Sequence, residues 1–295
     1  DAVYVQCPSA YLMMSEDGNE FTFEKSLYNA LMAALKDDAS QIAKYSPMEG
    51  HRCEGEEQCG MHINCCNANG PRAFALIPDF AVKKMGNEVY VNYYGDMSAS
   101  LENGHNKVLV KQHTTYPVSN VIDITIDVTK ENVFGLHLRV PVWSAQTVIT
   151  LNGEELKDIC PGTYHAITRK WKKGDHIQII LDMPARLLEQ NQMQAIVRGP
   201  IVLARDSRFN DGFVDETLVV DSEDGIVKAE VDSVPGFAWM RLKVPVTVGT
   251  DLEGVGMYRN ISFCDFASAG NTWDKQVRYR VWIPRTLDVK KGHLK

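Results

Sequence analysis

The stretch Ile122-Asp123-Ile124-Thr125-Ile126 alternates apolar with polar residues, which is the pattern of a β-strand with one buried face. Similar short apolar runs lie on both sides of it at even intervals, namely 89–94, 108–110, 136–140, 148–151, 177–181 and 201–203. Turn residues such as Asn152-Gly153 and Pro161-Gly162 separate several of these runs. The pattern predicts an antiparallel β-sandwich over residues 87–190. The runs 226–231, 239–248 and 277–283 predict a second β region over 191–295.

Upstream of Gly86 the apolar residues recur at three- and four-residue spacing, which predicts two helices. They are Phe23, Leu27, Ala30, Leu31, Ala34 and Leu35 in the first helix, and Ala73, Leu76, Ile77 and Phe80 in the second. Pro78 should kink or end the second helix. Two helices and a long loop cannot close a core of their own, so residues 1–86 should pack on another part of a larger fold. We therefore expect this region to be the last part of a helical domain.

The composition excludes some classes of protein. The net charge is -7, which argues against nucleic acid or an anionic membrane as the partner. No apolar run approaches the roughly 20 residues of a membrane span. The chain begins at Asp1 without a leader, which indicates a fragment or a processed product and leaves the compartment, cytoplasmic or periplasmic, undecided.

Two adjacent cysteines, Cys65 and Cys66, stand immediately before the second predicted helix. Neighbouring cysteines rarely bond to each other, because the short loop strains a disulfide, so the pair indicates metal ligands or a reactive thiol. The positive end of a helix favours the thiolate form. His62 lies close by and is a candidate substrate contact or metal ligand, although a hydrogen-bonded loop histidine is an equal alternative.

The remaining cysteines point less clearly to chemistry. Cys53 and Cys59 flank an acidic loop, and their six-residue spacing fits no standard zinc pattern, so we interpret them as structural or incidental. Cys160 and Cys264 lie among predicted strands and should be small buried hydrophobic residues.

A set of motifs in order along the chain resembles glycoside hydrolase family 127, the family of the β-L-arabinofuranosidases. The motifs are Phe23-Glu24-Lys25-Ser26-Leu27-Tyr28-Asn29-Ala30, Tyr45-Ser46-Pro47-Met48-Glu49-Gly50, Cys65-Cys66, Val89-Tyr90-Val91-Asn92, Leu138-Arg139-Val140-Pro141-Val142-Trp143, Trp171-Lys172-Lys173-Gly174-Asp175, Arg198-Gly199-Pro200-Ile201-Val202-Leu203-Ala204, Ala267-Ser268-Ala269-Gly270-Asn271-Thr272-Trp273 and Val281-Trp282-Ile283-Pro284. The resemblance covers nearly the whole chain. It implies that residues 1–86 are the C-terminal remnant of an (α/α)6 catalytic barrel, followed by antiparallel β-sandwich domains over 87–190 and 191–295.

The resemblance also implies roles for individual residues. Cys65 would be the catalytic nucleophile and a zinc ligand, and Cys66 a second zinc ligand. Glu24 and Tyr45 would approach the bound sugar; without the resemblance they would be interpreted as a solvated helix carboxylate and a core ring. The acid/base glutamate and the remaining zinc ligands would lie earlier in the barrel, and the fragment by itself should be inactive.

The sequence thus predicts part of a retaining exo-glycosidase that uses a zinc-bound cysteine and acts on arabinofuranosyl or related plant glycans. A homodimer of this protein is compatible with the sequence. The alternative is a non-catalytic β-sandwich binding or scaffolding protein, in which the cysteine pair is a structural zinc site or a redox site. The upstream reading frame distinguishes the two: helical repeats with a Glu-x-Cys segment favour the enzyme, and a genuine start near Asp1 favours the module.

Overall fold

The structure is a computed structural model that describes residues 24–53, 57, 60, 66–103, 106–232, 238–248, 257–285, 287–288 and 293–294. The chain divides into two compact units. One, which we call the sandwich unit, comprises Glu24 and residues 72–183. The other, the helix–sheet unit, comprises the described parts of 25–71 and 184–295. No helix in the described part of the chain is both long enough and apolar enough to cross a membrane.

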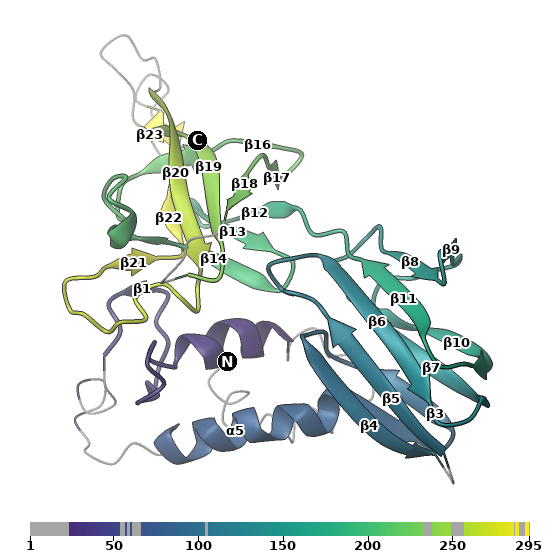
Figure 1. Cartoon of the computed structure of the whole chain (residues 1–295). Coiled ribbons are helices and arrows are strands. Elements are labelled where there is room, and N and C mark those ends of the chain that lie inside the picture. The colour runs from purple at the N-terminus through teal and green to yellow at the C-terminus, as the bar shows by residue number, and fades with distance from the viewer. Residues whose placement is uncertain are drawn as a thin grey trace. The chain divides into compact units, whose positions relative to one another are not determined.

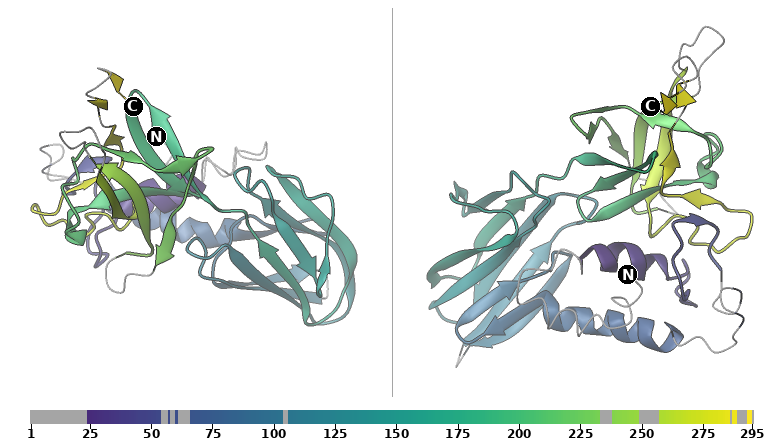
Figure 2. Two further views of the ribbon diagram at one scale, coloured as in Figure 1. Left: turned by 90° about the horizontal axis from the view of Figure 1, so that it is seen from above. Right: turned by 180° about the vertical axis from the view of Figure 1, so that it is seen from behind.

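The sandwich unit contains two sheets, which Figures 1 and 2 show stacked face to face. The six-stranded sheet has the order β4-β5-β6-β11-β8-β9. Its strands are β4 (Met97–Asn103), β5 (Asn106–His113), β6 (Val121–Val128), β8 (Val148–Leu151), β9 (Glu154–Glu155) and β11 (Asp175–Ile180). The four-stranded sheet has the order β10-β7-β3-β2. Its strands are β2 (Val82–Met85), β3 (Glu88–Val91), β7 (Asn132–Val140) and β10 (Thr163–Trp171).

Alternating side chains of both sheets form the core of this unit. Ile122, Ile124 and Ile126 on β6 are fully buried, and Phe134, Leu136 and Leu138 supply the facing layer from β7. Burial of an aliphatic or aromatic side chain contributes about 1.5–3 kcal/mol, so these alternating runs are sufficient to drive the sheets together. The predicted sandwich is confirmed, with one exception to its antiparallel pairing, because β3 runs parallel to β7.

The second predicted helix is also present. The helix α5 (Cys66–Ala81) ends within one turn of Pro78, as expected of a proline that removes a backbone donor. The first predicted helix is shorter: it is centred on the π-helical turn η2 (Ser26–Leu31), and helical backbone extends from Glu24 to Ala33.

The helix–sheet unit is built on a long antiparallel sheet with the order β15-β19-β20-β14-β13-β12-β17-β16. Its strands are β12 (Ala185–Gln190), β13 (Met193–Arg198), β14 (Ile201–Asp206), β15 (Leu218–Val220), β16 (Ser222–Glu223), β17 (Ile226–Val227), β19 (Arg241–Val248) and β20 (Met257–Asp265). Short strands extend it, namely β1 (Glu49–Gly50), β18 (Glu230–Asp232), β21 (Tyr279–Arg280) and β22 (Ile283–Pro284). A separate pair consists of β23 (Leu287–Asp288) and β24 (His293–Leu294).

The turn η2 packs on this sheet. The Asn29 amide donates to the Pro200 carbonyl at 2.8 Å and accepts from the Val202 backbone N–H at 2.8 Å. Ala33 belongs to the same buried cluster as Ala204, Cys264 and Phe266. The expectation that the helical region packs on something else is thus met by the C-terminal sheet. The barrel itself and the predicted domain boundaries stay predictions.

Candidate active site

The cysteine pair lies at the start of α5. Cys66 is the first residue of that helix, and its side chain is half-buried. Cys65 and His62 lie outside the described residues. A thiol at the first position of a sixteen-residue helix lies at the positive end of the helix dipole, which favours the thiolate. The location of Cys66 is therefore suited to a reactive or metal-binding thiol.

The first turn of α5 is held against the segment around Ile42. The Asn67 side chain accepts a hydrogen bond from the Ile42 backbone N–H at 3.3 Å. Gly70 is buried, and a Cβ there would lie 2.1 Å from Ile42 Cδ1, so the absence of a side chain permits this close approach. Asn67 and Gly70, which follow the cysteine pair, are therefore anchored in the helix–sheet unit.

Tyr45 lies three residues beyond Ile42, and 49% of its surface is exposed. The Lys44 ammonium lies 5.7 Å from its ring centroid. The next residue, Ser46, donates to the Ala30 carbonyl at 3.1 Å and so ties this loop to the helical segment around η2. The ring is not a core ring, and its exposed face could stack on a ligand.

Glu24 is fully buried in the sandwich unit. Its Oε1 accepts a hydrogen bond from Arg139 Nη2 at 2.7 Å and another from the Tyr116 hydroxyl at 2.5 Å. Arg139 is 3% exposed and also donates through Nε to the Asn92 carbonyl at 2.6 Å. The interpretation of Glu24 as a solvated helix carboxylate is therefore excluded.

The two carboxylate oxygens of Glu24 differ in their surroundings. Oε1 has two donors, whereas Oε2 is buried and has no hydrogen-bond partner among the described residues. Leaving a buried polar atom without a partner costs about 1–3 kcal/mol, and such atoms require an explanation. The geometry fits a carboxylate whose first oxygen is fixed by the protein and whose second can accept a hydrogen bond from a ligand hydroxyl.

Aromatic hydroxyls complete the surroundings of this ion pair. The Tyr94 hydroxyl donates to the Arg139 carbonyl, and the Tyr94 ring lies 5.7 Å from the guanidinium carbon. Burial raises the pKa of Tyr94 far above its ordinary value, so its hydroxyl stays a donor.

The five predicted site residues are thus only partly placed. Tyr45 and Cys66 belong to the helix–sheet unit, and Glu24 belongs to the sandwich unit. Sequence reasoning missed Arg139 and Tyr116 as the partners of Glu24. The signal available for Arg139 was a charged residue within the apolar strand 136–140, since an arginine between buried residues needs a counter-charge.

The donor chemistry of the cysteine pair fits zinc, which prefers thiolate, imidazole and carboxylate ligands in tetrahedral sites. Cys65 and Cys66 would supply two of the four ligands. Among the described residues, Cys66 belongs to no group of three or more potential metal ligands. The pair therefore fits half of a zinc site.

Comparison with known proteins assigns a family to part of the chain. Residues 88–183 match the family described as "Beta-L-arabinofuranosidase, GH127 middle domain". This range covers all strands of the sandwich unit except β2. A comparison with curated proteins found no match.

Solved structures share the fold over most of the chain. A GH127 β-L-arabinofuranosidase from Geobacillus stearothermophilus T6 matches with a TM-score of 0.78 and 19% identity, over 94% of this chain and 48% of that chain. A second GH127 β-arabinofuranosidase matches with a TM-score of 0.76 and 20% identity, over 91% and 46%. A structure described as a glycoside hydrolase matches with a TM-score of 0.74 and 20% identity, over 92% and 50%.

The chain spans about half the length of these solved structures. At such low identity they show the fold, while the family match rests on the strands and turns of residues 88–183. The resemblance indicated by the motifs of the sequence is thereby confirmed: residues 88–183 match the GH127 middle domain, and the chain has the fold of the corresponding part of two β-arabinofuranosidases of glycoside hydrolase family 127.

Proposed function

We propose that this chain is part of a retaining exo-glycosidase that releases β-linked L-arabinofuranose or a related sugar from plant-type glycans. The observation that carries the proposal is the match of residues 88–183 to the GH127 middle domain. The position of Cys66 at the start of α5 and the buried pair of Glu24 with Arg139 support it. Both features lie in motifs on which the family resemblance rests.

In the proposed reaction the Cys65 thiolate attacks the anomeric carbon of the terminal sugar, and the glycosidic oxygen leaves with a proton from a general acid. The product of this step is a glycosyl thioether on Cys65. Water then attacks the same carbon from the face that the leaving group vacated, and the thiolate is released. Two inversions at one carbon retain the configuration, which is the logic of retaining glycosidases with sulfur in place of a carboxylate oxygen.

A zinc ion held by Cys65 and Cys66 would keep the thiols deprotonated at neutral pH, since a free cysteine has a pKa of about 8.5. The start of α5 would contribute in the same direction through its exposed backbone N–H groups. Cys66 would therefore hold the metal, while Cys65 provides the sulfur that reacts.

Glu24 would bind a sugar hydroxyl through Oε2. Arg139 and Tyr116 hold Oε1, so the carboxylate cannot rotate away from its position without losing two hydrogen bonds. A fixed acceptor of this kind costs less conformational entropy on binding than a mobile surface carboxylate. Tyr45 would offer an apolar ring face to the sugar, as its half-exposed side chain permits.

The test uses the complete protein and a slow substrate or a haloacetamide analogue of the sugar. Cys65→Ala should abolish turnover without unfolding, because no other group can form the thioether. Cys66→Ala should lower zinc content first and activity as a consequence. Cys160→Ala is the matched control: this thiol is exposed in a loop of the sandwich unit and should be dispensable.

Mass spectrometry of the trapped enzyme locates the nucleophile directly. The adduct should lie on the peptide that contains Cys65. An adduct on an aspartate or glutamate would overturn the proposed nucleophile and return the enzyme to two-carboxylate chemistry.

A further inference from the structure

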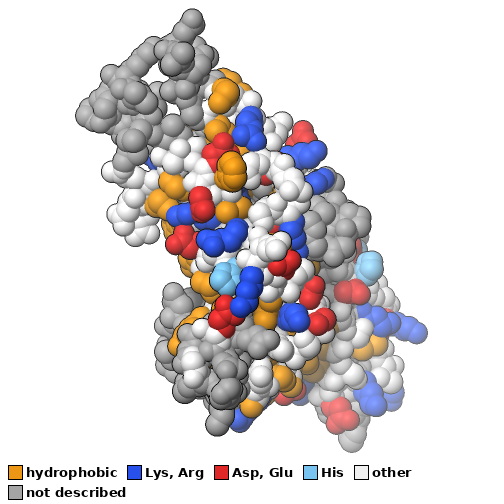
Figure 3. Space-filling model, turned by 90° about the vertical axis from the view of Figure 1, so that its left-hand side faces the viewer, with side chains coloured by type: hydrophobic (Ala, Val, Ile, Leu, Met, Phe, Trp, Pro, Cys, Tyr) orange, Lys and Arg blue, Asp and Glu red, His pale blue; other side chains and the backbone are white. Residues whose placement is uncertain are grey.

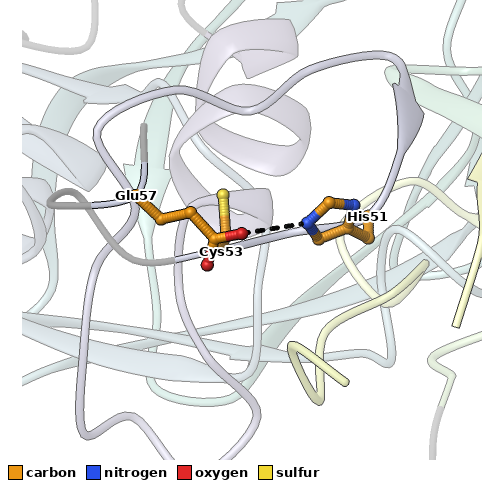
Figure 4. A group of neighbouring side chains, drawn as sticks. All are labelled: His51, Cys53 and Glu57. Carbon is orange, nitrogen blue, oxygen red and sulfur yellow. Dashed lines mark ion pairs between the residues drawn. The ribbon is translucent and has the colours of Figure 1, made fainter. Parts of the chain in front are cut away.

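A second group of potential metal ligands lies in the helix–sheet unit. His51, Cys53 and Glu57 place their ligand atoms within 4.8 Å of one another, as Figure 4 shows. The His51 Nε2 and Glu57 Oε1 atoms are 3.5 Å apart. Within the described residues this is the one group of three or more such side chains that converge in this way. It shares no residue with the Cys65–Cys66 pair.

Arg52 lies between His51 and Cys53 in the chain and fixes this segment to the core. Arg52 is 1% exposed and donates to the carbonyls of Ala33, Phe266 and Ala269, with Nε 2.6 Å from the last. Its side chain therefore points into the core. His51 and Cys53 flank this buried side chain and are themselves half-buried. Their ligand atoms lie within 4.8 Å of each other and of the Glu57 carboxylate.

Aromatic rings also hold the Arg52 side chain in place. The Arg52 guanidinium carbon lies 4.8 Å from the ring centroids of both Phe266 and Tyr279. Three carbonyl acceptors and two ring faces fix the backbone on both sides of Arg52. The imidazole and the thiol are therefore presented by a preorganised segment, and binding a ligand there would require little further ordering.

Glu57 is oriented by a lysine. Lys275 Nζ lies 3.0 Å from Glu57 Oε2, while Oε1 faces His51. A partner on the outer oxygen is the arrangement by which proteins orient a metal-binding carboxylate. The inner oxygen is left facing the imidazole and the thiol.

The His51 Nε2 atom faces Glu57 at a distance that suits a shared metal ion. This atom is buried from solvent and accepts or donates no hydrogen bond among the described residues. The 3.5 Å contact with Glu57 Oε1 is longer than a hydrogen bond. Two ligands about 2.1 Å from a tetrahedral zinc ion stand roughly 3.4 Å apart, which matches the observed separation.

We propose that His51, Cys53 and Glu57 bind a zinc ion that is separate from any metal held by Cys65 and Cys66. One imidazole nitrogen, one thiolate sulfur and one carboxylate oxygen are a zinc donor set, whereas magnesium and calcium take oxygen ligands. Water would fill the fourth position. On binding, the thiol S–H bond breaks, the sulfur bonds to zinc, and one proton is released to the solvent.

The role of this site is structural. It would link His51 and Cys53 to Glu57 within the helix–sheet unit. The sulfur spacing alone did not indicate it, because its other two ligands are a histidine and a glutamate. The interpretation of Cys53 as incidental is therefore replaced by this proposal.

The test is zinc binding by the full chain in which Cys65 and Cys66 are both replaced by serine, so that only the second site remains. Titration with Zn²⁺ against a chromophoric chelator should give one bound zinc per chain. About one proton should be released per zinc at pH 7, since a free thiol is protonated there. Loss of a residue that only orients a metal ligand already costs about 10–100-fold in affinity, so Cys53→Ser and His51→Ala should each weaken zinc binding at least about 100-fold.

Two further variants keep the outcome interpretable. Glu57→Gln changes an exposed side chain, so it should fold normally and still weaken zinc binding. Cys160→Ser removes an exposed thiol elsewhere and should leave the affinity unchanged. Equal zinc affinity in the parent and in Cys53→Ser, or no zinc bound by a folded parent, would overturn the proposal. Neither result bears on the Cys65 nucleophile, which is absent from this background.

Discussion

The buried arginines Arg52 and Arg139 lie one in each unit, and each is compensated differently. Arg52 is surrounded by carbonyl oxygens and aromatic ring faces, and desolvation lowers its pKa. Arg139 has a carboxylate partner, Glu24, at 2.7 Å. Carbonyls satisfy the donors of a guanidinium but do not neutralise its charge, whereas a carboxylate does both. Arg139 therefore depends on a single residue 115 positions away in the chain.

Breaking that ion pair should be strongly destabilising. Glu24→Gln would leave the Arg139 guanidinium buried without a counter-charge, at a cost of about 3–5 kcal/mol in the free energy of unfolding. Arg139→Met should cost a similar amount, because it leaves the Glu24 carboxylate buried without a counter-charge. The double variant should lose less than the sum, since neither buried charge then remains. Urea unfolding of the four proteins measures the coupling.

An exposed ion pair in the same unit provides the control. Lys170 and Glu131 are 2.5 Å apart, but both side chains are largely solvent-accessible. Exposed pairs contribute little, so Glu131→Gln should leave the urea midpoint almost unchanged. If Glu24→Gln were as mild as this control, the buried pair would not stabilise the sandwich unit.

At the scale of elements, turns and close contacts between segments determine which residues are tolerated at a position. The hairpin between β8 and β9 turns at Asn152-Gly153, where both residues have positive φ angles, 52° and 88°. These angles are those of the tight turn that Asn-Gly favours, so the predicted turn is confirmed. Gly270 also has a positive φ, 62°, but it lies against the buried ring of Tyr279.

Gly270→Ala should therefore be more damaging than a conformational penalty alone. A Cβ at this position would lie 2.6 Å from Tyr279 Cδ1, and that ring is fully buried and cannot move aside freely. The expected loss is about 2–4 kcal/mol, from the left-handed backbone together with overpacking. Thermal or urea unfolding of the full chain measures it.

Gly225→Ala is the matched comparison for Gly270→Ala. Gly225 has a similar φ of 75°, but a Cβ there would meet nothing within 4 Å. Its loss should be limited to about 1–2 kcal/mol from the left-handed conformation. Equal losses at the two positions would show that contact with Tyr279 does not matter.

At the scale of the whole molecule, many charged side chains lie beside a side chain of opposite charge. Figure 3 shows acidic and basic side chains interspersed on one face. Several carboxylates have lysine partners, among them Asp127 with Lys111 at 2.9 Å. Such pairs hold the ionised carboxylate in the folded state, and they add to stability only while it is ionised.

Stability should consequently fall on acidification. Hydrogen bonds from lysines lower the pKa of Glu57 and Asp127 below their ordinary values of 4.5 and 3.8. Their contribution is complete above these ordinary values and is lost as the pH falls through the lowered ones. The urea midpoint should therefore be lower at about pH 3 than at pH 6, and added salt should reduce the difference by screening exposed pairs.

Asp265 should oppose this trend. Burial raises its pKa, so the folded state favours its protonated form, and its effect on stability becomes more favourable as the pH falls. Asp265→Asn removes that contribution, and the decline between pH 6 and pH 3 should become steeper. A decline of equal or smaller slope in Asp265→Asn would contradict this assignment.

The sequence by itself determined those elements whose signal is local. The alternation at 122–126 indicated a strand, and the spacing of Ala73, Leu76, Ile77 and Phe80 indicated the helix α5. Both patterns arise because one face of the element is buried, and that face can be identified from neighbouring residues alone. The cysteine pair could also be recognised from the sequence alone, because Cys65 and Cys66 are adjacent residues.

The tertiary structure decided what depends on distant residues. The strands β10 and β20 were missed, because much of each is exposed and carries polar residues, so the partner strands define them. Cys160 was expected to be buried but is exposed in a loop, whereas Cys264 is buried as expected.

The same limit applies to the sites. The pairing of Glu24 with Arg139 joins residues far apart in sequence, and the His51, Cys53 and Glu57 group is organised by the core contacts of Arg52. The spacing of these residues along the chain predicts neither arrangement. A charge or a ligand atom acquires its partner only when packing brings separate segments together, and that is why these features appeared only in the folded chain.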